Sequence, residues 1–161
     1  MPGGKPTKRL VVVRIRGRVG VRRDVEDTLK MLRLYRKFHA TIVDDRESYR
    51  GMLQKVKDYV TWGEADEEVI ALLLKRRGRV TGGERLTDEY VKSLGFESVE
   101  DLARAIAEFK LDLKDVKGLK PYFRLHPPKG GFKRSTKRPY NDGGELGYRG
   151  PAIKELIKRM V

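Results

Sequence analysis

Apolar and polar residues alternate along the first 64 positions with two different periods. Residues 8–16 contain the apolar run Leu10 to Val13 and then arginines that alternate with Ile15, which predicts a strand. From Arg22 onward apolar residues recur at spacings of three and four, which is typical of one helical face. The predicted elements are a strand over 8–16, a helix from 22, a strand over 40–43, a helix from 48 with Ser48 as its N-cap, and a strand over 59–62.

This order of elements predicts an α+β fold. Each helix must lay its apolar stripe on a small sheet, and the connections are too short to hide a further element. We therefore expect residues 8–64 to form a β-α-β-α-β two-layer sandwich, preceded by a flexible basic arm over 1–7.

The rest of the chain, residues 65–161, is predicted to be a helical and Gly-rich extension. Residues 110–149 are rich in Gly and Pro, which predicts turns and short hairpins. The predicted helices are 66–77, 87–94 with Thr87 as its cap, 98–109 with Ser98 as its cap, and a closing helix that follows Gly150-Pro151.

Charge adds a functional expectation, because the net charge is +14. The first 23 residues and residues 116–140 each contain eight Lys or Arg and no Asp or Glu. Like charges held this close repel one another unless a partner neutralises them. The two segments therefore indicate a polyanionic partner, with nucleic acid as the leading candidate.

Several other classes of protein are disfavoured by composition. Cysteine is absent and only His39 and His126 are present, which excludes disulfides and a tetrahedral Cys/His metal site. The longest apolar run, 69–74, has six residues, far fewer than the about 20 of a membrane-spanning helix. We expect a soluble, cytoplasmic protein with no membrane contact, no cofactor and no metal.

The Gly-rich basic segment 127–138 is the sharpest candidate for nucleic-acid contact. Its glycines let the backbone approach a phosphate, Phe132 offers a stacking face, and Lys and Arg flank both. The alternative is a disordered solvated tail, but such a tail rarely interleaves aromatic residues.

Arginines near the first strand form a second candidate. Because Arg14, Arg16 and Arg18 alternate, we expect them to project from one edge or face towards phosphate while Val13 and Ile15 point inward. The alternative is an ordinary solvated sheet face.

Two rival interpretations concern DNA binding and catalysis. Residues 87–109 have the outline of a helix-turn-helix, but six acids and two bases give this segment a net charge of −4, which is unsuited to approaching phosphates. Asp44, Asp45 and Glu47 could hold Mg²⁺ in a nuclease, although a turn rich in capping carboxylates is far commoner. We predict no enzyme, and keep a sequence-tolerant DNA or chromatin protein and, less favoured, a metal-dependent nuclease as alternatives.

Two longer stretches carry a family resemblance. Val43-Asp44-Asp45 with residues 48–64, and residues 123–133, closely resemble the archaeal form of the L-thirty family of large-subunit ribosomal proteins, whose eukaryotic relative is L-seven. The resemblance covers essentially the whole chain. It implies a ferredoxin-like-related core with a three-stranded antiparallel sheet and a ribosome-bound, rRNA-contacting structural role. The loop Gly17-Arg18-Val19-Gly20 departs from the bacterial pattern, so bacterial contacts there do not carry over.

The resulting hypothesis is a scaffold that binds ribosomal RNA of the large subunit, with neighbouring ribosomal proteins as further partners and no independent homo-oligomer. The resemblance matches Arg50 and Gly51 to the family's Arg-Gly pair at the start of the second helix. It matches Lys129 to Lys133 to the family's Gly-rich RNA-contacting segment. The full set of predicted RNA-binding residues is Lys5, Lys8, Arg9, Arg14, Arg16, Arg18, Arg22, Arg23, Arg50, Gly51, Lys129, Gly130, Gly131, Phe132, Lys133, Arg134, Lys137, Arg138 and Arg149.

Overall fold

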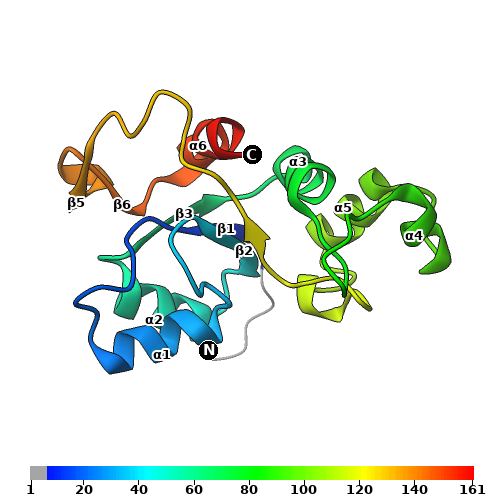
Figure 1. The fold of residues 1–161 in the computed structure, drawn as a ribbon, viewed down its shortest axis with the longest axis horizontal. Helices are drawn as coiled ribbons and strands as arrows, with labels where there is room; N and C mark the ends of the chain where they lie inside the picture. Colours follow the sequence, from blue (N-terminus) through cyan, green and yellow to red (C-terminus); the bar gives the residue numbers. More distant parts are fainter. Residues whose placement is uncertain (1–6) are drawn as a thin grey trace.

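A computed structural model describes residues 7–161, and it places one sheet between helices on both of its faces (Figure 1). The predicted arm 1–7, which includes Lys5, therefore lies almost entirely outside the described residues. The helices and strands are β1 (Arg9–Arg14), α1 (Arg23–Met31), β2 (His39–Asp44), α2 (Glu47–Val56), β3 (Val60–Glu64), α3 (Glu67–Arg77), α4 (Asp88–Ser93), α5 (Val99–Ala107), the 3₁₀ turn η1 (Leu113–Asp115), β4 (Phe123–Arg124), β5 (Ser135–Pro139), η2 (Tyr140–Asp142), β6 (Gly144–Tyr148), η3 (Gly150–Ala152) and α6 (Ile153–Met160).

The sheet has the strand order β4-β2-β1-β3-β6-β5, with β1 near its centre. Val12 of β1 lies opposite Thr41 of β2 and Trp62 of β3, and both pairings are antiparallel. The expected α+β class, with a three-stranded antiparallel sheet at its core, is thus confirmed. Trp62 is buried in the core between the sheet and helices α1 and α2.

The extension contributes three further strands. β4 pairs antiparallel with β2, whereas β6 pairs in parallel with β3. The expectation of a hairpin is wrong for β5 and β6, because these neighbours pair in parallel with an irregular register. Their sequence alternates poorly and contains Pro139, Gly144 and Gly147, which interrupt a regular ladder.

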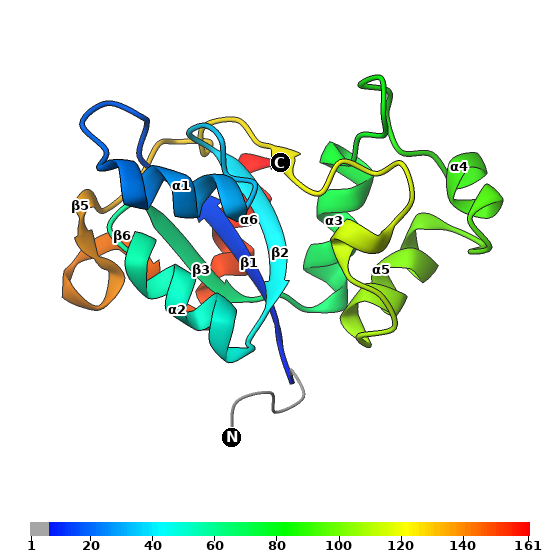
Figure 2. The same cartoon turned by 90° about the horizontal axis from the view of Figure 1, so that it is seen from below.

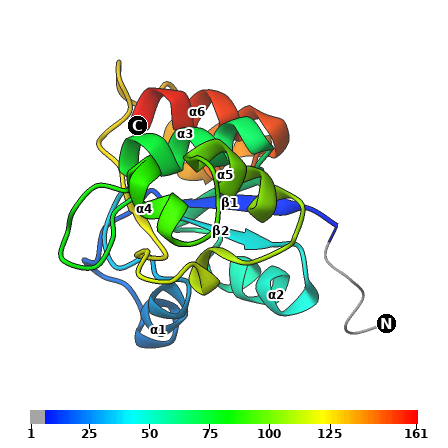
Figure 3. The same ribbon diagram turned by 90° about the vertical axis from the view of Figure 1, so that its right-hand side faces the viewer.

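Helices cover both faces of β1, so its side chains are buried in both directions. Leu10 and Val12 pack with residues of α1 and α2, while Val11 and Val13 pack with residues of α3 and α6. Figure 3 shows α6 and α3 on one side of the strands and α1 and α2 on the other. The core 8–64 is the expected two-layer sandwich, and the closing helix α6 adds a third layer.

Helices α3, α4 and α5 form a separate group beside the sheet, which we call the helical lobe (Figure 2). The predicted caps are confirmed here: Thr87 accepts a hydrogen bond from the amide of Tyr90, and Ser98 accepts one from the amide of Asp101. α5 packs along α3, which supports the structural interpretation of 87–109.

The predicted Ser48 cap is wrong, because α2 already begins at Glu47. Asp44 Oδ1 accepts a hydrogen bond from the amide of Arg46 at 3.0 Å, and the Asp44 carboxylate also binds the Arg46 guanidinium. This side-chain turn starts the helix earlier than Ser48 would. In the described part of the chain, no helix has both the length and the apolar character required to cross a bilayer.

Candidate nucleic-acid interface

Three exposed segments meet at one end of the molecule, which we call the basic end: the β1–α1 loop (16–23), the end of α2 (54–58) and the β5–η2 segment (135–142). In Figures 1 and 2 the loop and β5 lie at the same end of the long axis, and α4 lies at the other. Lys57 and Asp58 line a cavity of about 440 Å³ together with Pro139 and Tyr140. The guanidinium of Arg16 lies 5.1 Å from the centre of the Tyr59 ring, which connects the loop to the same region.

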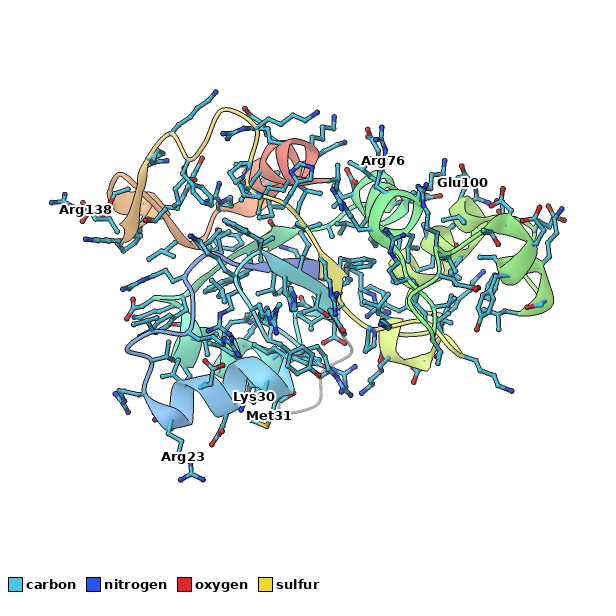
Figure 4. All side chains as sticks on the ribbon, in the orientation of Figure 1. Arg23, Lys30, Met31, Arg76, Glu100 and Arg138 are labelled. Atoms are coloured by element: carbon cyan, nitrogen blue, oxygen red, sulfur yellow. The ribbon has the colours of Figure 1, made fainter. Side chains whose placement is uncertain are left out.

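The β1–α1 loop presents its cations to solvent. Arg16, Arg18, Arg22 and Arg23 are all exposed, and Figure 4 shows Arg23 pointing away from the protein. Arg22 forms an ion pair with Asp24 at 2.8 Å, but both side chains are largely solvated, so the pair holds the guanidinium only weakly. These four predicted residues remain available to a polyanion.

Helix α2 presents Arg50 and Gly51 to solvent. Arg50 lies 3.6 Å from Asp45 and its side chain is 67% exposed. A Cβ built on Gly51 meets no atom within 4 Å, and Gly51 lacks the positive φ that favours glycine elsewhere. Within residues 7–161, neither packing nor backbone conformation explains a glycine inside this helix.

Segment 129–133 is ordered by the end of α6. The amide of Lys129 donates to the Arg159 carbonyl at 2.9 Å, and the Arg159 guanidinium donates to the carbonyls of Lys129 and Gly131. Gly130 and Gly131 have φ of +79° and +74°, so the turn itself requires glycine at both positions. This part of 127–138 is therefore not a disordered tail.

The predicted stacking role of Phe132 conflicts with its position. Its ring packs against Phe38, with ring centroids 6.2 Å apart, and belongs to the margin of the core. Arg134 is also engaged internally, since it donates to the Tyr140 carbonyl at 2.6 Å and lies over the Tyr140 ring. Lys133, Lys137 and Arg138 are exposed, and Figure 4 shows Arg138 projecting outward from the basic end.

The prediction that Arg14 projects from the sheet is wrong. Its side chain is fully buried, with Nε bonded to the Arg16 carbonyl, Nη1 to the Leu34 carbonyl and Nη2 to Glu26 at 3.1 Å. Because α1 and its loops cover this face of β1, the guanidinium joins the strand to the helix.

Arg9 and Arg149 are also buried, which corrects their assignment to the RNA-binding set. Arg9 joins the core to the helical lobe: Nε donates to the Ile106 carbonyl at 2.7 Å, and Nη1 binds Asp112 at 2.8 Å. Arg149 joins β6 to β3 through Thr61 Oγ1 at 2.8 Å and Glu145 at 2.9 Å. Their charges are satisfied within the protein.

Sequence reasoning missed Lys57, which is an exposed cation of the basic end. It also gave no role to Lys120 and Arg124, which belong to the acid-free segment 116–140. The available signal was their charge alone, and charge does not reveal which surface a residue shares.

Two of the three carboxylates proposed for a nuclease, Asp44 and Asp45, already have partners. Asp44 is buried against Arg46, and Asp45 accepts hydrogen bonds from Thr7 and from the amide of Lys8. Partial burial raises the pKa of Asp45, but the hydrogen bonds that it accepts from Thr7 and Lys8 together outweigh burial and hold this pKa below its usual value. The geometry is that of a turn stabilised by side chains, and among residues 7–161 no cluster of three metal-ligating side chains occurs.

Known proteins resemble this chain over most of its length. A family model described as Ribosomal protein L30p/L7e matches residues 10–60. The large ribosomal subunit protein uL30 of Methanopyrus kandleri is 56% identical over 149 residues, which cover 91% of this chain and 100% of that protein. The corresponding proteins of Staphylothermus marinus and Archaeoglobus fulgidus are 54% and 53% identical and cover 93% and 92% of this chain, and 96% and 97% of their own lengths.

Proposed function

The chain belongs to the ribosomal protein L30p/L7e family, and from this premise we propose how it serves as a structural constituent of the large ribosomal subunit. It binds ribosomal RNA through the exposed cations of the basic end, through Arg50 and Gly51 of α2, and through the ordered turn at 129–133. The buried arginines Arg9, Arg14 and Arg149 hold the scaffold together and take no part in RNA contact.

The observation that carries this proposal is the separation of charge along the molecule. Exposed cations of the β1–α1 loop and β5 lie at one end, while the segment 87–109 in the helical lobe at the other end has a net charge of −4. RNA helices are bound mainly through phosphate, 2′-hydroxyl and shape. A protein with one positive end therefore approaches RNA in a preferred orientation.

The acidic surface of the lobe suits a different environment. We infer that α4 and α5 face solvent or a basic neighbouring ribosomal protein, since phosphates would repel them. The protein acts in the cytoplasm as part of the ribosome, without catalysis, without membrane contact and without forming an independent homo-oligomer. The family to which it belongs supports this non-catalytic role.

Two measurements test the proposal. In sedimented cell lysate the chain should travel with the large subunit. In filter binding at matched salt, the purified protein should prefer large-subunit rRNA to duplex DNA, with an affinity that falls as salt rises. Preference for duplex DNA would instead favour the sequence-tolerant DNA or chromatin protein.

A further inference from the structure

Four cations from two distant parts of the chain meet in a pocket where the sheet adjoins the helical lobe. The pocket has a volume of about 250 Å³ and is lined by Arg77, Arg79, Gly83, Lys120, Tyr122 and Arg124. None of these six residues is acidic. The volume is below the about 300 Å³ at which small-molecule sites usually begin, so the pocket suits a single small group.

Backbone hydrogen bonds fix the position of these cations. The amide of Lys120 donates to the carbonyl of Arg79 at 2.9 Å, and an antiparallel bridge joins Val80 to Leu119 next to them. Arg124 lies in β4 opposite His39, so its backbone belongs to the sheet. The cations are therefore preorganised by the fold and are not carried by an independent tail.

The pocket is also electrostatically unsatisfied. No salt bridge within residues 7–161 involves any of the four cations, whereas Lys75, in the same last turn of α3 as Arg77, pairs with Glu100. The Nη1 of Arg79 is buried and has no hydrogen-bond partner among the described residues. A buried donor without an acceptor is costly, and an anion in the pocket would remove that cost.

The positive charge of the pocket also affects the neighbouring residue His39. The Tyr122 ring stacks on His39, with centroids 5.2 Å apart, and packs edge-on against Tyr35. Burial and then the positive charge of Arg124 lower the pKa of His39 to about 4. The presence of a cation at Arg77 is partly explained by α3 itself, because the helix dipole favours positive charge in the last turn. No helix dipole of this kind explains the cations at Arg79, Lys120 and Arg124.

We propose that this pocket binds one phosphate group of the ribosomal RNA backbone, with Arg79, Lys120 and Arg124 as its principal ligands. The inference rests on the proposed function and adds a second anchor, distant from the basic end. A planar guanidinium can donate two parallel hydrogen bonds to phosphate oxygens, which suits the arginines of this pocket. Two separated phosphate anchors would fix the orientation of the protein on RNA.

Charge-removing variants test this anchor. Arg79→Gln and Arg124→Gln are compared with Lys92→Gln, a matched control on exposed α4. Binding to large-subunit rRNA is measured by filter retention between about 50 and 200 mM salt. Log affinity falls linearly with log salt, and loss of one phosphate contact should reduce the magnitude of this slope by about 0.7–0.9. At 0.1 M salt this corresponds to an affinity loss of about five- to eightfold. The control should retain the wild-type slope.

Each result has a defined meaning. If the Arg79→Gln and Arg124→Gln slopes equal that of the control, the pocket is no RNA anchor, although the proposed function stands. If wild-type protein fails to bind rRNA, the proposed function fails and this inference fails with it.

Thermal unfolding separates a binding role from a structural one. Removing one of several mutually repelling cations should leave the Tm of the free protein unchanged or higher, so a lower Tm in both variants overturns the proposal. Inorganic phosphate should raise the Tm of the wild type more than that of the variants. If phosphate does so while the rRNA slopes stay unchanged, the pocket binds small anions and its assignment to RNA is wrong.

Discussion

Gly51 offers the most direct test of how α2 meets RNA. It lies inside α2, at an exposed position where an added Cβ meets no atom within 4 Å. In an isolated protein, glycine is a poor choice at such a site, because it has more backbone freedom to lose on folding than alanine. We predict that Gly51→Ala stabilises the free protein and weakens its binding to rRNA.

The size of the stabilising effect follows from helix propensity. Replacing glycine by alanine inside an exposed helix gains about 0.5–1 kcal/mol. For a chain of this length, about 1 kcal/mol shifts Tm by about 2–4 °C, so Tm should rise by about 1–4 °C. If an RNA backbone lies against the helix at Gly51, a methyl group at that place forces a separation, and we expect an affinity loss of at least about tenfold, or about 1.4 kcal/mol.

The assay combines thermal unfolding of the free protein with filter binding to large-subunit rRNA. A size series of Gly51→Ala, Gly51→Ser and Gly51→Gln should lower affinity progressively, while each variant stays at least as stable as the wild type. Lys92→Ala on α4 serves as the control for an exposed helical position at the opposite end. Wild-type affinity across the series, together with the raised Tm, would refute the argument that RNA approaches α2 at this residue.

Other predictions concern stability and salt dependence. Burial, followed by the positive charge of nearby arginines, lowers the pKa of His39 to about 4, below its unfolded value, so stability present at pH 7 is lost as pH falls from about 6.5 towards 4. The loss is at most about 3.4 kcal/mol, and His39→Gln should make Tm depend less on pH. Arg14→Gln should cost about 3–5 kcal/mol in urea unfolding, because Glu26 and two carbonyls lose their partner. Arg18→Gln should change stability by less than about 0.5 kcal/mol. The double variant Lys137→Gln/Arg138→Gln should reduce the magnitude of the salt slope by about 1.4–1.8 without changing Tm, and an unchanged slope would remove both residues from the interface.

Regular elements were predictable because their patterns are local. The apolar run of β1 and the spacing of Val25, Leu29 and Leu32 depend on a few neighbouring residues, and the structure places all three side chains in the core. The caps at Thr87 and Ser98 are local as well, since each side chain binds an amide three residues away. Such local patterns can be recognised without knowledge of the tertiary structure.

The third layer and the outer strands were not predictable in the same way. β5 and β6 have no clean alternation, and their pairing depends on β3 lying alongside β6. The early start of α2 depends on one side chain, Asp44, turning back to the amide of Arg46. Competing cap residues at adjacent positions cannot be ranked from sequence alone.

The buried arginines show the limit of interpreting charge from sequence. Arg9, Arg14 and Arg16 all lie in the predicted strand 8–16, yet only Arg16 is exposed. The partners that bury Arg9 come from residues about a hundred positions later, including the Ile106 carbonyl and Asp112. Because Arg9 and Arg14 are five residues apart, they point to opposite faces of β1, and a half-solvated sheet would expose one of them. Both are buried because β1 is covered on both faces.

The burial of some arginines and the exposure of others affect how the protein assembles with RNA. Charges more than about 8–10 Å apart in solvent are largely screened at physiological salt, so scattered surface cations would contribute independently and weakly. The fold instead neutralises Arg9, Arg14 and Arg149 inside the scaffold. It also groups other cations in the loop 16–23 and at 137–138 at one end, and in the pocket around Arg79 and Arg124 at the junction with the lobe. With the acidic segment 87–109 disfavouring the reversed approach, two separated groups define an axis. A rigid scaffold is then required, because the two groups can be matched to fixed phosphates only if the distance between them is constant.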